Sequence, residues 1–407
     1  MPSQQVVQKA LETIRKSEAN YQYFFEKLDS PDWLQPLHDA GLFQQPPAAV
    51  RVSDRVMYPS WPETGYLARV AGRLPDSVLD ILLRLPATDN VRVHGELVCV
   101  ALALPPGHAA RWVATEIAWI ENQPSLDLLG ERLGQLIVHL ATGGEGEASI
   151  GVAGRLFETA PDVTPGPIVR DVRIKLRDWE FDNLLHRISP VLLSTLRLRA
   201  FEFLQESLAT AVQMADPEAP AGQSWIWRPA IEEHEQNPGH RRPLDSLLVA
   251  IRDGGSHLID VESIPVTDVV TGLLRRGGIF ARIGLYLLAK HGQSAQALVA
   301  RCVGDRALFD AFEVRHEYES LSEAWFGRID EDTRQLVLTW IGAGPGEDQV
   351  ARWRERLASD AVPAEIQRWQ RDRLYPLRGS LPVAWFCRYD ELVAAVGPLV
   401  RSPGFAV

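Results

Sequence analysis

The hydrophobic pattern between Tyr66 and Ala160 predicts six helices in three successive pairs. Apolar residues recur there with the spacing of one helical face, and proline or glycine interrupts each run. The predicted pairs are 66–71 with 77–83, 91–104 with 109–121, and 126–141 with 148–160. The Leu-Pro corners at Leu74 and Leu104 lie 30 residues apart, which is the length of one antiparallel helix pair.

The repeated pair predicts an all-α fold, because consecutive antiparallel helix pairs bury their apolar faces by stacking on one another. We therefore expect a superhelical stack of helix pairs, that is, a HEAT-like α-solenoid. The same helical spacing predicts an N-terminal array over residues 1–160 and a C-terminal array over residues 179–407. Between them, residues 161–178 carry three prolines and an alternating stretch, which indicate a linker or a small extended segment.

Outside the three pairs, element boundaries follow from prolines and from the loss of periodicity. Val6–Leu28 is predicted as one helix, and residues 45–62, with four prolines, as an ordered loop that Trp61 anchors. The long helical stretch 179–214 is expected to break at Pro190, since proline removes a backbone hydrogen bond and clashes with the preceding turn.

Composition excludes several classes of protein. Of 407 residues, 46% are hydrophobic, and no run reaches the ~18 apolar residues that span a bilayer, so we expect a cytoplasmic protein with no membrane contact. The formal net charge of −11 disfavours nucleic acid as a partner, although a local basic groove would still permit it. Cys99, Cys302 and Cys387 are far apart in apolar helical contexts. We expect buried thiols there rather than disulfides or a zinc site.

Two glycine-containing stretches resemble ligand-binding loops but are better explained as helix ends. Leu336–Glu347 has the apolar run and the glycines of a strand that enters a dinucleotide-binding loop. Its apolar residues nevertheless lie on one helical face, acidic residues precede it, and glycine commonly ends a helix. Residues 143–146 lack the Gly-Lys-Ser/Thr of a phosphate-binding loop. We therefore expect no cofactor.

One polar cluster, Glu232–Glu235 with His240, has side chains that bind metals or transfer protons in other proteins. Its spacing matches no zinc motif, and no Ser-His-Asp or Cys-His arrangement accompanies it, so neither a metal site nor catalysis is indicated. We interpret it as a surface turn whose carboxylates pair with Arg241 and Arg242. The mixed-charge run 315–319 is interpreted as a solvated helix face. Packing and a capping salt bridge are the roles expected for Trp225, Trp227 and Arg228.

Three stretches resemble the helical-repeat region of large bacterial proteins that are often encoded in anti-phage defence islands. They are Tyr23–Leu37, Trp61–Arg69 and Trp225–Gln236, and the resemblance covers nearly the whole chain. In such proteins a helical array commonly follows an effector or nucleotide-hydrolysing domain and senses or scaffolds. Here the first helix begins almost at Met1 and the chain stops at Val407, so the resemblance implies a split, shortened or partner-dependent form.

Two functions of different classes are compatible with these features. The first is a non-enzymatic scaffold or sensor that binds a protein partner, since stacked repeats form extended concave surfaces. The alternative is a HEAT-like DNA-binding or DNA-repair enzyme, in which some of the twelve tryptophans, with a carboxylate, would handle a damaged base. This alternative requires a basic track for the phosphates, which the net charge disfavours.

We place the partner-binding surface in the irregular segment 225–242, because tryptophan and arginine are enriched at interface hot spots and irregular insertions commonly carry function. An internal plug that closes the stack is the other interpretation of this segment. The candidate partner-binding residues are Trp225, Trp227, Arg228, Glu232, Glu233, His234, His240, Arg241 and Arg242.

Overall fold

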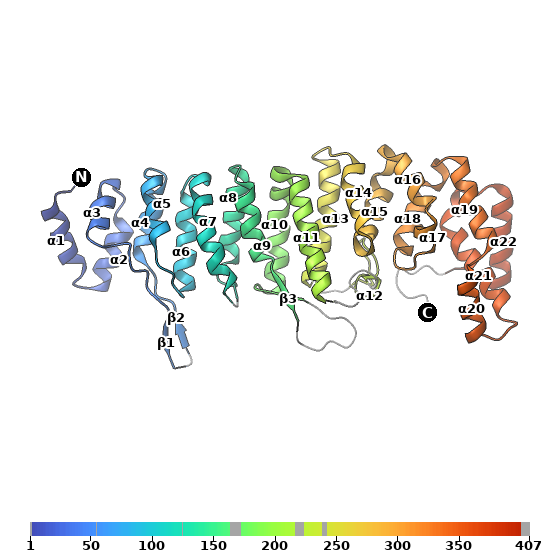
Figure 1. Cartoon of the computed structure of the whole chain (residues 1–407), viewed down its shortest axis with the longest axis horizontal. Coiled ribbons are helices and arrows are strands. Elements are labelled where there is room, and N and C mark those ends of the chain that lie inside the picture. Colours follow the sequence, from blue (N-terminus) through green and yellow to red (C-terminus); the bar gives the residue numbers. More distant parts are fainter. Residues whose placement is uncertain are drawn as a thin grey trace. The chain divides into compact units, whose positions relative to one another are not determined.

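The structure is a computed structural model, which describes residues 2–53, 55–123, 125–162, 172–215, 224–237 and 242–399. Nearly all of its regular structure is helical, which confirms the predicted all-α class (Figure 1). Among these residues there are four short strands, which form two separate two-stranded sheets.

The chain divides into two compact units, which we call unit 1 and unit 2. Within the described residues, unit 1 comprises 2–162, 172–211 and 242–250, and unit 2 comprises 212–215, 224–237 and 251–399. The division differs from the predicted one, because unit 1 continues well beyond residue 160.

Among the described residues, unit 1 contains the first ten α-helices, most of α11, both sheets and the start of α13. Its helices are α1 (Gln4–Ile14), α2 (Glu18–Lys27), the 3₁₀ helix η1 (Pro31–Trp33), α3 (Leu34–Asp39), α4 (Pro62–Ala71), α5 (Pro75–Arg84), α6 (Val91–Ala103), α7 (Pro106–Glu121), α8 (Gly130–Thr142), α9 (Gly146–Leu156), α10 (Asp178–Leu196) and most of α11 (Leu198–Ala215). Its strands are β1 (Val50–Val52), β2 (Arg55–Met57), β3 (Thr159–Pro161) and β4 (Val172–Ile174).

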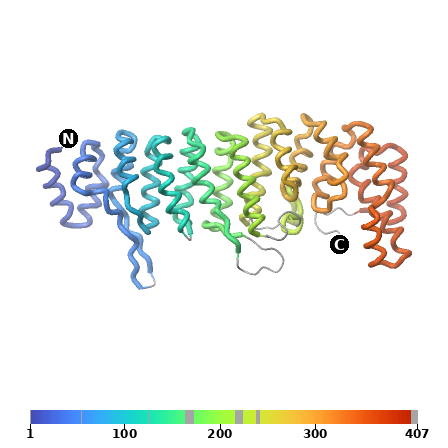
Figure 2. The backbone as a smooth tube through the Cα atoms, viewed as in Figure 1, coloured from blue at the N-terminus to red at the C-terminus, as the bar shows by residue number. Residues whose placement is uncertain are grey.

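The six helices predicted between Tyr66 and Ala160 all form, as α4 to α9. Each packs on its neighbour in sequence and on the next helix but one: α4 on α6, α6 on α8 and α8 on α10, with α5 on α7 and α7 on α9 (Figure 2). Pro75 of the first corner, and Pro106, which follows the proline of the second corner, are the first residues of α5 and α7. Proline fits this position because the N–H that it lacks would have no helical partner.

Two predicted boundaries in unit 1 are wrong. Val6–Leu28 is not one helix, because the Ser17 hydroxyl accepts a hydrogen bond from Asn20 N at 3.2 Å and so begins α2 separately. The expected break at Pro190 is absent, and α10 continues through it to Leu196. Pro190 is exposed, so the helix carbonyl that loses its partner there lies on the side facing water.

The described part of residues 45–62 contains an antiparallel hairpin that the sequence pattern did not indicate. Val50 pairs with Met57, and Val52 with Arg55. Trp61 at the end of this stretch is buried, and its backbone N donates to Glu96 Oε2 at 2.9 Å. The second sheet pairs β3 with β4, at the two sides of residues 163–171, which lie outside the described part of the predicted 161–178 segment.

Unit 2 contains the C-terminal helices. They are the end of α11, α12 (Ser224–Trp227), the second part of α13 (Pro243–Asp260), α14 (Val266–Arg276), α15 (Gly278–His291), η2 (Gly292–Ser294), α16 (Gln296–Val303), α17 (Arg306–Asp310), α18 (Arg315–Trp325), η3 (Phe326–Arg328), α19 (Glu331–Ala343), α20 (Glu347–Arg356), α21 (Val362–Leu374), η4 (Tyr375–Ser380) and α22 (Val383–Val396). Within the unit, α15 packs on both α14 and α18, and α21 packs on α19, α20 and α22.

Two further expectations are decided by these helices. The run Leu336–Ile341 lies inside α19, as the helix interpretation predicted. Of the three cysteines, Cys302 is buried, Cys99 is partly buried and Cys387 is exposed. The expectation of three buried thiols is therefore wrong for Cys387, which lies in α22.

No described helix is both long and apolar enough to cross a membrane.

Candidate functional site

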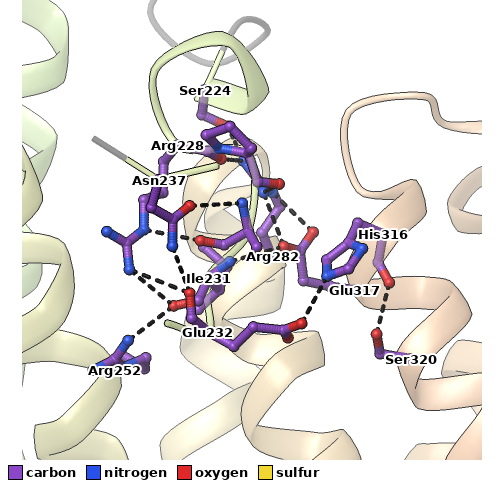
Figure 3. Close-up of polar contacts among 12 residues, drawn as sticks. Ser224, Arg228, Ile231, Glu232, Asn237, Arg252, Arg282, His316, Glu317 and Ser320 are labelled. Carbon is purple, nitrogen blue, oxygen red and sulfur yellow. Dashed lines mark hydrogen bonds and ion pairs between the residues drawn. The ribbon is translucent and has the colours of Figure 1, made fainter. Parts of the chain in front are cut away.

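The irregular part of the candidate site begins where α12 ends. Pro229 stops this short helix soon after Trp227, because the residue before a proline avoids the helical conformation. The chain then runs without regular structure to Asn237, and we call residues 224–237 the 224–237 segment. It lies in unit 2 against α15 and α18 (Figure 3).

Arg282 of α15 is the residue on which the segment is built. Its guanidinium makes five hydrogen bonds, which is all that its five N–H groups provide. Nε and Nη2 donate to the two carboxylate oxygens of Glu317 at 2.9 and 2.8 Å. The remaining bonds reach the carbonyl oxygens of Arg228 and Pro229, each at 2.8 Å, and the Ser224 hydroxyl at 3.3 Å.

Both charges of this ion pair are buried: the Arg282 and Glu317 side chains are each 1% exposed. A charge taken out of water costs several kcal/mol unless it is paired and its hydrogen-bonding groups are satisfied. Here both conditions hold, since Glu317 Oε1 also accepts from Ile231 N at 3.2 Å. The pair therefore ties the main chain of the 224–237 segment to α15 and α18.

The other carbonyl groups of the segment are held by side chains in the same way. Arg228, only 2% exposed, folds back and donates to the carbonyl oxygens of Ala230 and Ile231 at 2.8 and 3.3 Å. Arg252 of α13 donates to Ile231 O at 3.1 Å, and the Asn237 amide donates to Glu232 O at 2.7 Å. As a result, the five consecutive carbonyls from 228 to 232 all accept hydrogen bonds from side chains.

Acidic and amide side chains lie on the outer side of the segment. Glu232 pairs with His316 Nε2 at 3.1 Å, and Glu233 pairs with Arg252 Nη1 at 2.9 Å (Figure 3). Burial disfavours the Arg252 cation, but Asp253 and Glu233 outweigh it, so the pKa of Arg252 is raised above its usual value. Beyond these pairs, Glu235 and Gln236 are exposed. We call residues 232–236 the acidic turn.

The structure places most of the predicted binding residues in this segment and gives several of them roles in packing. Trp225 lies edge-on to Phe312 with the ring centroids 5.1 Å apart, and Trp227 is 9% exposed. His234 Nδ1 accepts from Gln236 N at 3.2 Å within the turn. Arg242 belongs to unit 1, where its Nε lies 3.7 Å from Asp245 Oδ2. His240 and Arg241 are outside the described residues.

Sequence reasoning missed the partners that organise the segment. The run 315–319 is not a solvated face, because Glu317 and Tyr318 are 1% and 3% exposed. Glu232 and Glu233 pair with His316 and Arg252, which the sequence did not suggest. The sequence could have indicated that Arg282 has a buried partner. It is a single arginine inside the apolar run 279–288, and a buried arginine must be paired. Its partner, Glu317, is 35 residues away.

The described residues bring no three or more His, Cys, Asp or Glu side chains together in a way that would hold a metal ion. The arrangement does provide an acidic surface on the 224–237 segment, whose main-chain carbonyls accept hydrogen bonds from buried arginines. Comparison with known proteins adds no assignment, because no protein-family model, curated protein or solved structure matches the chain.

Proposed function

We propose that the chain is a non-enzymatic helical-repeat scaffold or sensor that binds a protein partner through the acidic turn. A protein with lysine or arginine side chains at its contact surface is the partner that this turn fits. The resemblance of three stretches to helical arrays of defence-island proteins supports a role in a bacterial defence or signalling system.

The observation that carries the proposal is the contrast between the two sides of the 224–237 segment. On the inner side, five successive carbonyls are held by Arg228, Arg252, Arg282 and Asn237. On the outer side, Glu235 and Gln236 are exposed and Glu233 retains 61% side-chain exposure. A surface loop whose main chain is already ordered loses little conformational freedom on binding, and this favours affinity.

The helix packing within unit 1 supports the scaffold part of the proposal. There α4, α6, α8 and α10 follow one another, as do α5, α7 and α9. A HEAT-like α-solenoid, in which such pairs continue as a superhelical stack, is the architecture that we propose for the chain. Stacked repeats are a common support for partner-binding surfaces.

The test uses the double variant Glu235→Lys, Gln236→Lys. The first substitution reverses a negative charge in the turn and the second adds a positive charge. Both side chains are exposed, so the variant is expected to keep its melting temperature. Glu233 is left unchanged because it also pairs with Arg252. The matched control is Glu355→Lys, which alters another exposed acidic residue of unit 2. Partners captured by each purified protein from bacterial extract are identified by mass spectrometry and measured again with purified components.

We expect the turn variant to weaken capture of a basic partner by about tenfold or more, a loss of ~1.4 kcal/mol of binding free energy, while the control keeps it. Equal capture by the two variants would remove the turn from the proposal. A protein that instead binds duplex DNA tightly at low salt, and releases it as salt rises, would favour the DNA-binding alternative.

A further inference from the structure

A second candidate surface lies in unit 1, on the hairpin formed by β1 and β2, which we call the 50–57 hairpin. It extends away from the neighbouring helices α4 and α6 (Figure 1). All six residues of its strands are exposed, and four of them are apolar: Val50, Val52, Val56 and Met57, with exposed fractions of 42–53%. The adjacent Tyr58 is 37% exposed.

The base of this hairpin is firmly held. Asn90, which is 0% exposed, donates from its amide to the carbonyl oxygens of Pro47 at 3.0 Å and Pro59 at 2.8 Å. Its Oδ1 meanwhile accepts from Arg92 N and caps the start of α6. Ala49 N also donates to Asp89 at 2.8 Å. One buried side chain therefore joins the two arms of the hairpin to the helical body.

The cross-strand register places the apolar side chains together. Residues paired across a hairpin have side chains on the same face, and alternate residues of a strand share a face. Val50 pairs with Met57 and Val52 with Arg55, so these four lie on one face, with Arg51 and Val56 on the other. The first face is thus an apolar surface with one arginine at its end.

An isolated two-stranded hairpin is only marginally stable in water, and each strand leaves one edge with unpaired backbone groups. In the described residues, no third strand pairs with β1 or β2. Such an edge is the template for β-augmentation, in which an extended peptide adds as a strand and its alternate side chains meet the exposed face.

We propose that the 50–57 hairpin binds an extended segment of a partner protein in which apolar and acidic residues alternate. The segment adds as a third strand. Its apolar side chains cover Val50, Val52 and Met57. Its carboxylates point to the opposite face, where they meet the exposed Arg51, whose Nη2 lies 3.7 Å from Asp89 Oδ2. The inference does not depend on the acidic turn, because the two surfaces belong to different units.

The experiment uses the full chain and an array of short synthetic peptides in which valine alternates with glutamate, lysine or serine. The main variant is Val52→Thr with Met57→Thr, which removes apolar surface but keeps residues suited to strands. Leu128→Thr, at a 71% exposed position of the same unit, is the matched control. Hydrogen exchange of the amides of residues 50–57 is measured with and without peptide.

We expect the valine–glutamate peptides to bind and to slow exchange in the hairpin, with the double variant weaker by about tenfold or more and the control unchanged. Arg51→Glu, on the face that the charged peptide side chains meet, is expected to shift the preference toward the valine–lysine peptides. The Glu235→Lys, Gln236→Lys variant is expected to bind the peptides as the wild type does. A negative result for partner binding at the acidic turn can therefore be distinguished from a negative result for peptide binding at the hairpin.

Three results would overturn the proposal. The first is that no alternating peptide binds, or that all three kinds bind equally. The second is that Leu128→Thr weakens binding as much as the hairpin variant. The third is self-association in sedimentation experiments that the hairpin variant abolishes, since the occupant would then be a second copy of the chain.

Discussion

Arg282 and Glu317 form a two-bonded ion pair inside unit 2, and each side chain is 1% exposed. Replacing a buried ion pair with apolar residues is often neutral or stabilising, so its presence is weak evidence of a stabilising role. The pair is better explained by what else it holds, namely the carbonyls of Arg228 and Pro229 and the Ile231 N–H. Together with Arg252 of α13 and His316 of α18, it positions this irregular segment.

Removing one member of the Arg282–Glu317 pair is therefore expected to lower the free energy of unfolding much more than removing a member of a surface ion pair. Glu317→Ala leaves the buried Arg282 charge uncompensated, and we expect a loss of about 3–5 kcal/mol in the free energy of unfolding. The measurement is a urea titration, with hydrogen exchange reporting on the amides of residues 228–237. On the same helix, Glu323→Ala alters a half-exposed carboxylate 3.7 Å from Arg378 and should cost less than about 1 kcal/mol. Similar losses for both variants would contradict this account.

Asn90 has two roles that a single substitution separates. Asn90→Asp keeps an oxygen that caps α6 but replaces the amide donor, so a buried carboxylate would face the carbonyls of Pro47 and Pro59. We expect it to destabilise unit 1 by at least the ~1–3 kcal/mol that an unsatisfied buried polar group costs. Proteolysis within residues 48–58 is the direct measurement. Cleavage there should speed up in Asn90→Asp, and unchanged cleavage would show that the amide does not hold the hairpin.

Glu116 is expected to make unit 1 less stable as the pH rises. It is buried beside His94, with 2.9 Å between Oε2 and Nδ1. Burial raises the pKa of Glu116, and His94 opposes the shift only in part. A raised folded pKa means that this contribution to stability is complete below the unfolded pKa of about 4.3 and is lost as pH rises through the folded pKa.

The check is the urea midpoint as a function of pH in the wild type and in Glu116→Gln, which does not ionise. Between about pH 4.3 and the raised pKa, the wild type should lose stability relative to this variant. Glu202→Gln, an exposed control on α11, should follow the wild type. A difference between wild type and Glu116→Gln that grows in the opposite direction would show that the pKa is lowered.

The helices were predictable because their signals are local. Proline corners, glycine ends and one-sided apolar spacing gave all six helices between Tyr66 and Ala160. The expected break at Pro190 failed because its effect depends on which side of α10 faces water, and sequence spacing alone did not weigh this. The strands of the 50–57 hairpin have three residues each, too few for an alternating pattern to be distinguished from a loop.

The candidate site was only partly predictable for a different reason. The 224–237 segment was chosen from its own aromatic and charged residues, but its order comes from Arg252, Arg282 and Glu317 on other helices. Long-range pairs of this kind leave no periodic trace. The charged surroundings of Glu317 in sequence even suggested exposure, whereas its side chain is among the most buried in unit 2.

The Asn90 contact also has a consequence for the entropy of the chain. Because one side chain brings Pro47 and Pro59 together, the intervening residues form a closed loop whose ends stay fixed to α6. The entropic cost of closing a flexible loop grows only with the logarithm of its length, about 0.6 kcal/mol for each doubling. Extra residues inserted between β1 and β2 would therefore cost little, which makes this loop a natural place to graft a foreign peptide without disturbing the helices.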